Sequence, residues 1–96
     1  MELYVLVIYD ISDDNLREQV AQFLKSKGLK RIQRSAFLGI ATPSLIREIE
    51  AGIRRLVRGF EGVNVQIFPL TPASYKRRIV IGDVLESDSE DSILLT

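Results

Sequence analysis

Asp10 is the residue whose type and position most clearly suggest chemistry in this 96-residue sequence. The chain contains no His and no Cys, so catalysis must rest on carboxylates, hydroxyls, Lys, Arg or a bound metal. Asp10 directly follows the apolar and β-branched run 3–9, which predicts a central strand. Functional groups collect at the carboxyl ends of strands in open α/β sheets. We therefore predict that Asp10 is catalytic; the alternative is a turn residue that starts a helix.

A single carboxylate holds a divalent metal weakly, and a second copy of the chain would change this. A two-fold axis brings a second Asp10 opposite the first, and two facing carboxylates either share a proton or recruit a cation. An all-oxygen site with few protein ligands suits Mg²⁺ or Mn²⁺, which can support phosphodiester cleavage. We therefore expect Asp10 to be a metal ligand within a homodimer.

The charges are segregated along the chain although the net charge is zero. Residues 1–82 contain all 13 basic residues and eight acids, whereas residues 83–96 contain five acids and no base. A basic body suggests a polyanionic partner such as RNA or duplex DNA; the alternative is a solvated surface with a solubilising tail. Arginines can contact the phosphate backbone and an aromatic ring can stack on a base. The predicted nucleic-acid contacts are Tyr9, Arg17, Arg31, Arg34 and Phe37, with core packing as the alternative for both aromatic residues.

Strand and helix signals alternate along the chain. Residues 12–14 supply an N-cap and Gly28 a C-terminal cap for a first helix. Residues 29–41 look extended, either as one kinked strand or as two short strands that meet near Arg34. Thr42 and Pro43 open a second helix that stops near Gly59. The remaining signals are an alternating strand from residue 63 towards residue 69, a connector at 71–75 and an extended run at 77–83.

This order predicts an α+β, ferredoxin-like (βαββαβ) domain with an additional C-terminal strand at 77–83. Both helices would cover one sheet face, so apolar side chains on the other face favour a sheet-to-sheet homodimer. We expect the domain to span residues 1–83 and residues 84–96 to form an acidic, flexible tail. The apolar run at 3–9 is too short to cross a bilayer, so a cytoplasmic protein without membrane contact is expected.

Two segments resemble the CRISPR-associated endoribonuclease family Cas2, and archaeal members most closely. They are YVLVIYDISDDNLR at 4–17 and the stretch 28–39 that contains RIQRSAFLG, and the likeness extends over residues 3–83. The resemblance implies a ferredoxin-like homodimer with Asp10 of each chain as a metal ligand at the interface. It also implies nuclease or nucleic-acid roles for Tyr9, Arg17, Arg31 and Phe37. Relatives often carry further arginines where this chain has Glu18 and Gln19, and an aromatic residue where it has Arg34.

The expected function is a CRISPR adaptation protein that combines two roles. One is a metal-dependent endonuclease acting on RNA or DNA, which an intact Asp10 permits without establishing. The other is a structural subunit that works with the Cas1 integrase in spacer acquisition, as the resemblance implies. The alternatives are a toxin-like ferredoxin-fold ribonuclease that works without an integrase, and a non-catalytic nucleic-acid-binding or regulatory dimer.

Overall fold

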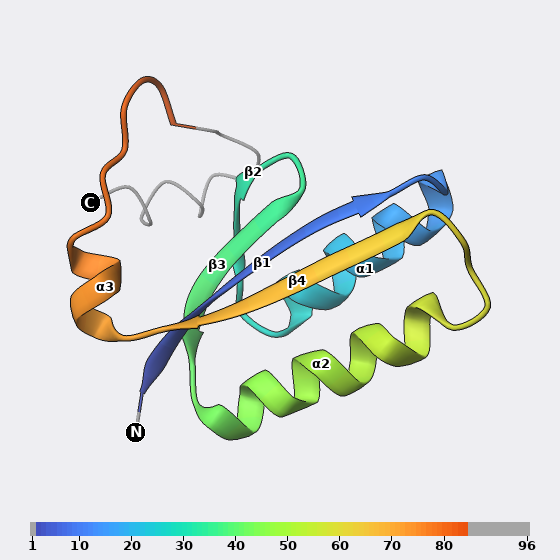
Figure 1. The fold of residues 1–96 in the computed structure, drawn as a ribbon, viewed down its shortest axis with the longest axis horizontal. Coiled ribbons are helices and arrows are strands. Elements are labelled where there is room, and N and C mark those ends of the chain that lie inside the picture. Colours follow the sequence, from blue (N-terminus) through green and yellow to red (C-terminus); the bar gives the residue numbers. More distant parts are fainter. Residues whose placement is uncertain (1, 85–96) are drawn as a thin grey trace.

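One four-stranded antiparallel sheet organises the chain (Figure 1). The computed structural model describes residues 2–84. The strand order is β2–β3–β1–β4, which is the ferredoxin-like arrangement that the sequence predicts. The elements are β1 (Leu3–Ile11), α1 (Asp14–Ser26), β2 (Lys30–Gln33), β3 (Ala36–Ala41), α2 (Pro43–Val57), β4 (Val63–Leu70) and α3 (Pro72–Lys76).

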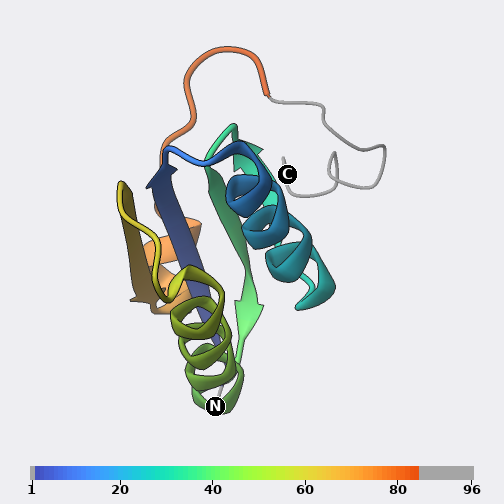
Figure 2. The same cartoon turned by 90° about the vertical axis from the view of Figure 1, so that its right-hand side faces the viewer.

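The two long helices lie on the same side of the sheet, and the short helix α3 lies on the other side (Figure 2). Successive side chains of a strand point to opposite faces, and β1 shows this alternation in its burial. Its odd-numbered residues from Val5 to Ile11 are buried beneath α1 and α2, on what we call the helix-covered face. Its even-numbered residues, from Tyr4 to Asp10, belong to the opposite face, which we call the open face.

Capping residues and a close helix contact hold the helix-covered side together. The side chain of Asp13 accepts a hydrogen bond from the backbone N–H of Leu16 at 2.8 Å and begins α1. Thr42 does the same for α2. Gly52 of α2 packs against Phe23 of α1 so closely that a Cβ atom at residue 52 would lie 2.1 Å from the Phe23 ring. The largest fully buried side chains are Phe37, Leu16, Leu24, Leu29, Ile49, Val5, Val7 and Val20.

Residues 29–41 form two strands, which settles the alternative that the sequence leaves open. β2 and β3 pair around a turn at Arg34 and Ser35, and their register shifts between Arg31 and Gln33. This turn lies at the same end of the sheet as the carboxyl end of β1, because the backbone N–H of Tyr9 donates to the Ser35 carbonyl at 2.9 Å.

The expectation of a plain connector at residues 71–75 is wrong, because this stretch contains the helix α3. Thr71 and Pro72 repeat the N-cap and first-turn pattern of the second helix, and Thr71 Oγ1 accepts a hydrogen bond from Ser74 N at 3.1 Å. The Tyr75 ring then stacks on Tyr4 of β1, with ring centroids 3.8 Å apart. The helix therefore anchors the chain on the open face.

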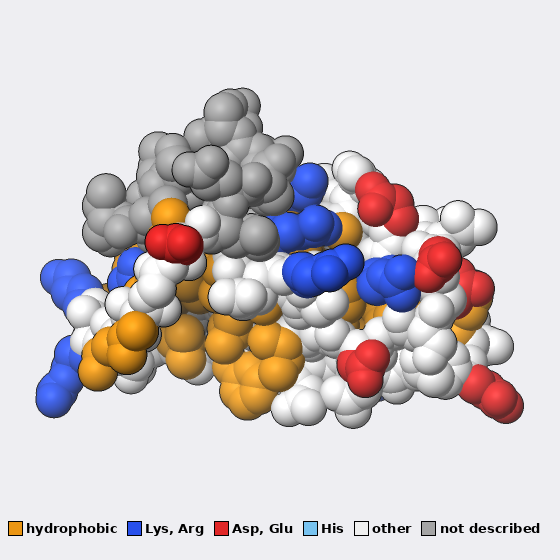
Figure 3. Space-filling model, turned by 90° about the horizontal axis from the view of Figure 1, so that it is seen from above, with side chains coloured by type: hydrophobic (Ala, Val, Ile, Leu, Met, Phe, Trp, Pro, Cys, Tyr) orange, Lys and Arg blue, Asp and Glu red, His pale blue; other side chains and the backbone are white. Residues whose placement is uncertain are grey.

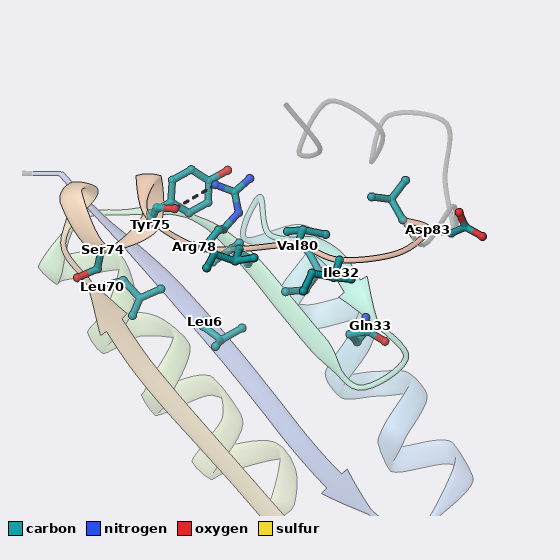
Figure 4. Close-up of a pocket in the computed structure, with 13 residues that line it drawn as sticks. Leu6, Ile32, Gln33, Leu70, Ser74, Tyr75, Arg78, Val80 and Asp83 are labelled. Carbon is teal, nitrogen blue, oxygen red and sulfur yellow. Dashed lines mark hydrogen bonds between the residues drawn. The ribbon is translucent and has the colours of Figure 1, made fainter.

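The expected C-terminal strand is not formed within a single chain. Residues 78–84 have no regular structure and cross the open side of the sheet as an extended segment (Figure 4). They border an apolar groove of about 430 Å³ that Leu6, Ile32 and Leu70 also line. Ile79 and Ile81 are 83% and 90% exposed, and no strand within residues 2–84 pairs with this segment. Of the expected tail at 84–96, only Val84 lies within the described residues.

No helix in residues 2–84 is both long and apolar enough to cross a membrane.

Candidate functional site

Asp10 stands on the open face at the carboxyl end of β1. Its side chain is exposed and lies across from Asn64 of β4. The Asn64 Oδ1 atom already accepts a hydrogen bond from Gln66 Nε2 at 3.0 Å. Within residues 2–84 the Asp10 carboxylate makes no hydrogen bond or ion pair, so its oxygens are available to a ligand.

The oxygen donors around Asp10 do not complete a metal site within one chain. In the described part of the molecule no three His, Cys, Asp or Glu residues come together as metal ligands would. Mg²⁺ often binds through one or two carboxylates and keeps several waters. The exposed Asp10 carboxylate is therefore of the type that Mg²⁺ takes as one of its few protein ligands.

A polar hollow of about 200 Å³ lies on the other side of β1, between the start of α1 and the β2–β3 turn. We call it the arginine hollow, because three arginines are among its lining residues. Figure 3 looks down on this end of the molecule and shows Lys and Arg side chains in a row, separate from a gathering of hydrophobic side chains. The lining residues are Tyr9, Asp14, Arg17, Glu18, Arg31, Arg34 and Ser35.

Arg17 is held in place by its own helix and by the end of β1. Its Nη1 atom donates to the carbonyl of Ile11 at 2.8 Å, and its Nη2 atom donates to Asp14 Oδ1 at 2.5 Å. The Asp14 carboxylate is largely exposed, so this ion pair adds little to stability. Together with the hydrogen bond to Ile11, the ion pair instead holds the Arg17 guanidinium in position at the rim of the hollow.

Arg31 packs against the core at the hollow, and one of its hydrogen-bond donors has no acceptor within residues 2–84. Its guanidinium lies 5.1 Å from the centroid of the Phe37 ring, a cation–π contact. Its Nε atom is buried and has no hydrogen-bond partner within residues 2–84. A buried donor without an acceptor costs about 1–3 kcal/mol. Arg31 also lines the hollow, so an anion there could pair with its positive charge.

Phe37 supports Arg31 from the core, which corrects the expectation that its ring stacks on a base. The side chain is fully buried, so a base has no access to it. The ring lies opposite Val7 in the β1–β3 register and packs beside Tyr9, with ring centroids 6.3 Å apart. The alternative of core packing therefore describes Phe37 correctly.

Tyr9 is nearly buried and forms one wall of the hollow. Burial raises the pKa of the Tyr9 phenol, and the positive charges of Arg31 and Arg17 oppose this shift in part. The phenol consequently stays protonated at neutral pH and can donate a hydrogen bond to an anion in the hollow.

Comparison with known proteins identifies the family. Residues 1–78 match the family described as CRISPR associated protein Cas2. This chain belongs to the Cas2 family.

Several archaeal relatives support this assignment. The chain is 38% identical to CRISPR-associated endoribonuclease Cas2 2 of Pyrobaculum aerophilum, over 83% of this chain and 87% of the relative. It is 42% identical to the Cas2 endoribonuclease of Korarchaeum cryptofilum, over 83% and 85%. A Cas1/Cas2 endonuclease fusion of Thermoproteus tenax is 44% identical over 62% of this chain, which spans about a fifth (22%) of the fusion.

Solved structures agree with the fold. A crystal structure of Cas2 superposes with a TM-score of 0.73 at 26% identity, covering 92% of this chain and 94% of that one. The crystal structure of hypothetical protein TT1823 from Thermus thermophilus gives a TM-score of 0.74 at 27% identity, covering 88% and 96%.

The residues that the sequence singles out in this Cas2 chain do not form one site. The arginine hollow brings together Tyr9, Arg17, Arg31 and Arg34, and Phe37 lies beneath it. Asp10 belongs to the open face and does not line the hollow. Three further lining residues, Asp14, Glu18 and Ser35, are not among the predicted site residues. No local pattern points to Ser35, because only the fold of the β2–β3 turn brings it beside β1.

Proposed function

We propose that this Cas2 chain acts as a homodimer that cleaves nucleic-acid phosphodiesters and takes part in CRISPR adaptation. One observation carries the proposal: consecutive residues, Tyr9 and Asp10, place an arginine hollow and a free carboxylate on the two sides of one strand end. Arginines bind phosphate and position a backbone, while a carboxylate can hold a divalent ion. Relatives at 38–42% identity are named endoribonucleases, which supports the nuclease role.

The open face supports a dimer because much of it is apolar and uncovered. Ile40 and Phe68 are 53% and 40% exposed on this face. β4 is an edge strand, so its outer backbone groups have no partner strand within the described chain. Packing two open faces together would bury these side chains. Residues 79–81 of one chain could then pair with β4 of the other, which fits the expected additional strand.

The same packing would make the two Asp10 residues neighbours across the two-fold axis. Asp10 of each chain would then hold Mg²⁺ or Mn²⁺. When bound, the ion would supply charge stabilisation for phosphodiester cleavage. The chain's own contribution would be positioning, with Arg17 and Arg31 holding phosphates beside the reacting one and the neutral Tyr9 phenol donating to a phosphate oxygen.

The second role is that of a subunit in spacer acquisition together with Cas1. The Thermoproteus tenax relative is a single polypeptide with Cas1 and Cas2 endonuclease parts. Two proteins that work together are often found fused, so we propose Cas1 as the protein partner of this chain. Co-purification of the two tagged proteins tests this association, and the absence of a complex would favour a nuclease that works alone.

The decisive experiment measures cleavage by the full chain. Fluorescein-labelled single-stranded RNA and duplex DNA are incubated with the protein and MgCl₂ or MnCl₂ over a range of pH. Asp10→Asn should lower the cleavage rate by roughly 100-fold or more, because the ligand charge is lost and the shape is kept. Glu2→Gln is a matched control, since it removes an exposed acid next to the other end of β1.

Two results would separate the roles. Absence of cleavage by the unmodified protein under all these conditions would overturn the nuclease proposal. Normal spacer acquisition by Asp10→Asn would show that the adaptation role is structural and independent of cleavage.

A further inference from the structure

We infer that the acidic segment 86–91 binds the arginine hollow of its own chain and competes there with nucleic acid. This inference rests on the proposed function, because it assigns a regulator to the same phosphate-binding surface. Four of the six residues at 86–91 are acids, and residues 85–96 contain no base. Carboxylates pair with arginine through the same forked hydrogen bonds as phosphates. The segment therefore carries the chemistry that the hollow binds.

The described part of the chain ends beside β2, the strand that carries Arg31 of the hollow. Asp83 and Val84 line the apolar groove together with Ile32 and Gln33 of β2 (Figure 4). Gln33 and Ile32 are the direct neighbours in sequence of Arg34 and Arg31, which line the hollow. The described chain thus ends next to the β2 hairpin, which contributes Arg31 from the strand and Arg34 from the turn.

The length of the segment suits this short path. An extended chain spans at most about 3.3–3.6 Å per residue. Glu86 therefore reaches about 7 Å from Val84, and Asp91 reaches about 24 Å. These spans exceed the spacing of about 4.7–4.9 Å between neighbouring strands of a sheet.

The arginines of the hollow still have binding capacity. Arg17 is paired with Asp14, but neither Arg31 nor Arg34 forms an ion pair with any residue of 2–84. Both side chains line the hollow, so their guanidinium groups are placed to pair with carboxylates. The two acids of the hollow have other partners, since Asp14 pairs with Arg17 and Glu18 accepts a hydrogen bond from Gln22 Nε2 at 2.9 Å.

Tethering makes a weak contact effective. A short flexible tether gives an effective concentration in the millimolar range. With an effective concentration of about 1 mM and an intrinsic dissociation constant of about 0.1 mM, the ratio of bound to unbound segment would be about ten. Nucleic acid would have to displace the segment, and its apparent dissociation constant would be raised about tenfold.

Disulfide trapping tests the contact without any need for nuclease activity. The chain contains no Cys, so two introduced cysteines are the only thiols. The pair Ser35→Cys and Ser89→Cys should oxidise to an intramolecular disulfide at low salt, because Ser35 lines the hollow. The control pair is Ser44→Cys and Ser89→Cys. Ser44 is exposed in the first turn of α2, and the full length of β3 separates it from Ser35.

We expect the Ser35 pair to form its disulfide at least about tenfold faster than the control pair, and high salt to abolish the difference. Equal rates for the two pairs would overturn the inference. A covalent dimer as the main product would also overturn it as stated, because the segment would then occupy the hollow of another chain.

The competition is tested by binding. The full chain with Glu86→Gln, Asp88→Asn, Glu90→Gln and Asp91→Asn is compared with the unmodified chain, using anisotropy of fluorescein-labelled single-stranded RNA at low salt. Neutralising the segment should lower the dissociation constant about tenfold. The same comparison in an Arg31→Gln, Arg34→Gln background should show little change, because the segment's binding site is already weakened.

A tenfold gain that persists in that background would overturn the inference, since general charge repulsion would then explain it. Failure of both proteins to bind RNA has a different meaning. That result would overturn the nucleic-acid role of the hollow and with it the competition, whereas disulfide trapping alone would decide whether the segment docks.

Discussion

The two faces of the sheet differ most at the carboxyl end of β1. On the helix-covered face, Tyr9 is packed, its phenol is neutral, and the neighbouring arginines are held by Phe37, Asp14 and the end of the strand. On the open face, one residue further along the same strand, Asp10 is exposed and has no partner within the described chain. The arginine hollow is therefore formed within one chain, whereas the proposed carboxylate site would need a second chain to complete it.

The largest expected effect comes from removing the ring that supports the arginine hollow. Phe37→Ala should lower the free energy of unfolding by about 3–5 kcal/mol, because it empties a fully buried site. Phe37→Leu keeps an apolar side chain and should cost much less, about 1.5 kcal/mol, while it removes the ring face beneath Arg31. Urea unfolding measures both. If RNA binding by Phe37→Leu equals that of the unmodified chain, the ring does not orient Arg31.

The open face is tested by a charge placed in the proposed dimer interface. Phe68→Glu should raise the dimer dissociation constant by about 100-fold, equivalent to about 3 kcal/mol, because a buried unpaired carboxylate is costly. Sedimentation measures the effect. Phe60→Glu is the matched control, since Phe60 is similarly exposed (45%) in the loop after α2. The two faces would not be independent if Phe68→Glu also abolished RNA binding by the hollow.

The effect of replacing an arginine of the hollow on RNA binding should depend on how buried that arginine is. Arg31→Gln should weaken RNA binding about tenfold, because charge-assisted hydrogen bonds from a partly buried group contribute about 1.5 kcal/mol. Arg34 is exposed in the β2–β3 turn, so Arg34→Gln should weaken binding only about two- to threefold. Fluorescence anisotropy over a range of salt measures both. Arg55→Gln, on the exposed surface of α2, provides the baseline, and equal effects at all three positions would argue against a specific hollow.

The smallest effect concerns the pH dependence of stability. The raised pKa of Tyr9 means that the folded chain keeps this proton at a pH where the unfolded chain loses it. The contribution of Tyr9 is therefore fully present below about pH 10, the pKa of an unperturbed tyrosine, and it is lost as the pH rises further. Tyr9→Phe should make the decline in unfolding free energy shallower between about pH 9 and 11. Urea unfolding at each pH tests this, and an unchanged slope would contradict it.

Several elements could be read from local patterns because local physics decides them. The run 3–9 is apolar and β-branched, and Thr42 followed by Pro43 both caps and begins a helix. The same Thr-Pro pattern at 71–72 begins α3, where the sequence predicts a connector. That helix is only five residues long, and the stacking of Tyr75 on Tyr4 ties it to a strand far away in sequence.

The sequence by itself determined the order of the elements from β1 to β4, the place of Asp10 at a strand end, the separation of the basic body from the acidic residues, and the resemblance to Cas2. These properties depend on residue types and on spacings of a few positions. Only the tertiary structure decided that Tyr9 and Asp10 serve different faces, that Phe37 is buried, and that Arg31 and Arg34 meet Arg17. The reason is physical. Alternate residues of a strand point to opposite faces, but which face is buried is decided only when the helices cover one side of the sheet. The β2–β3 turn likewise lies beside α1 only because of the register in which the strands pair.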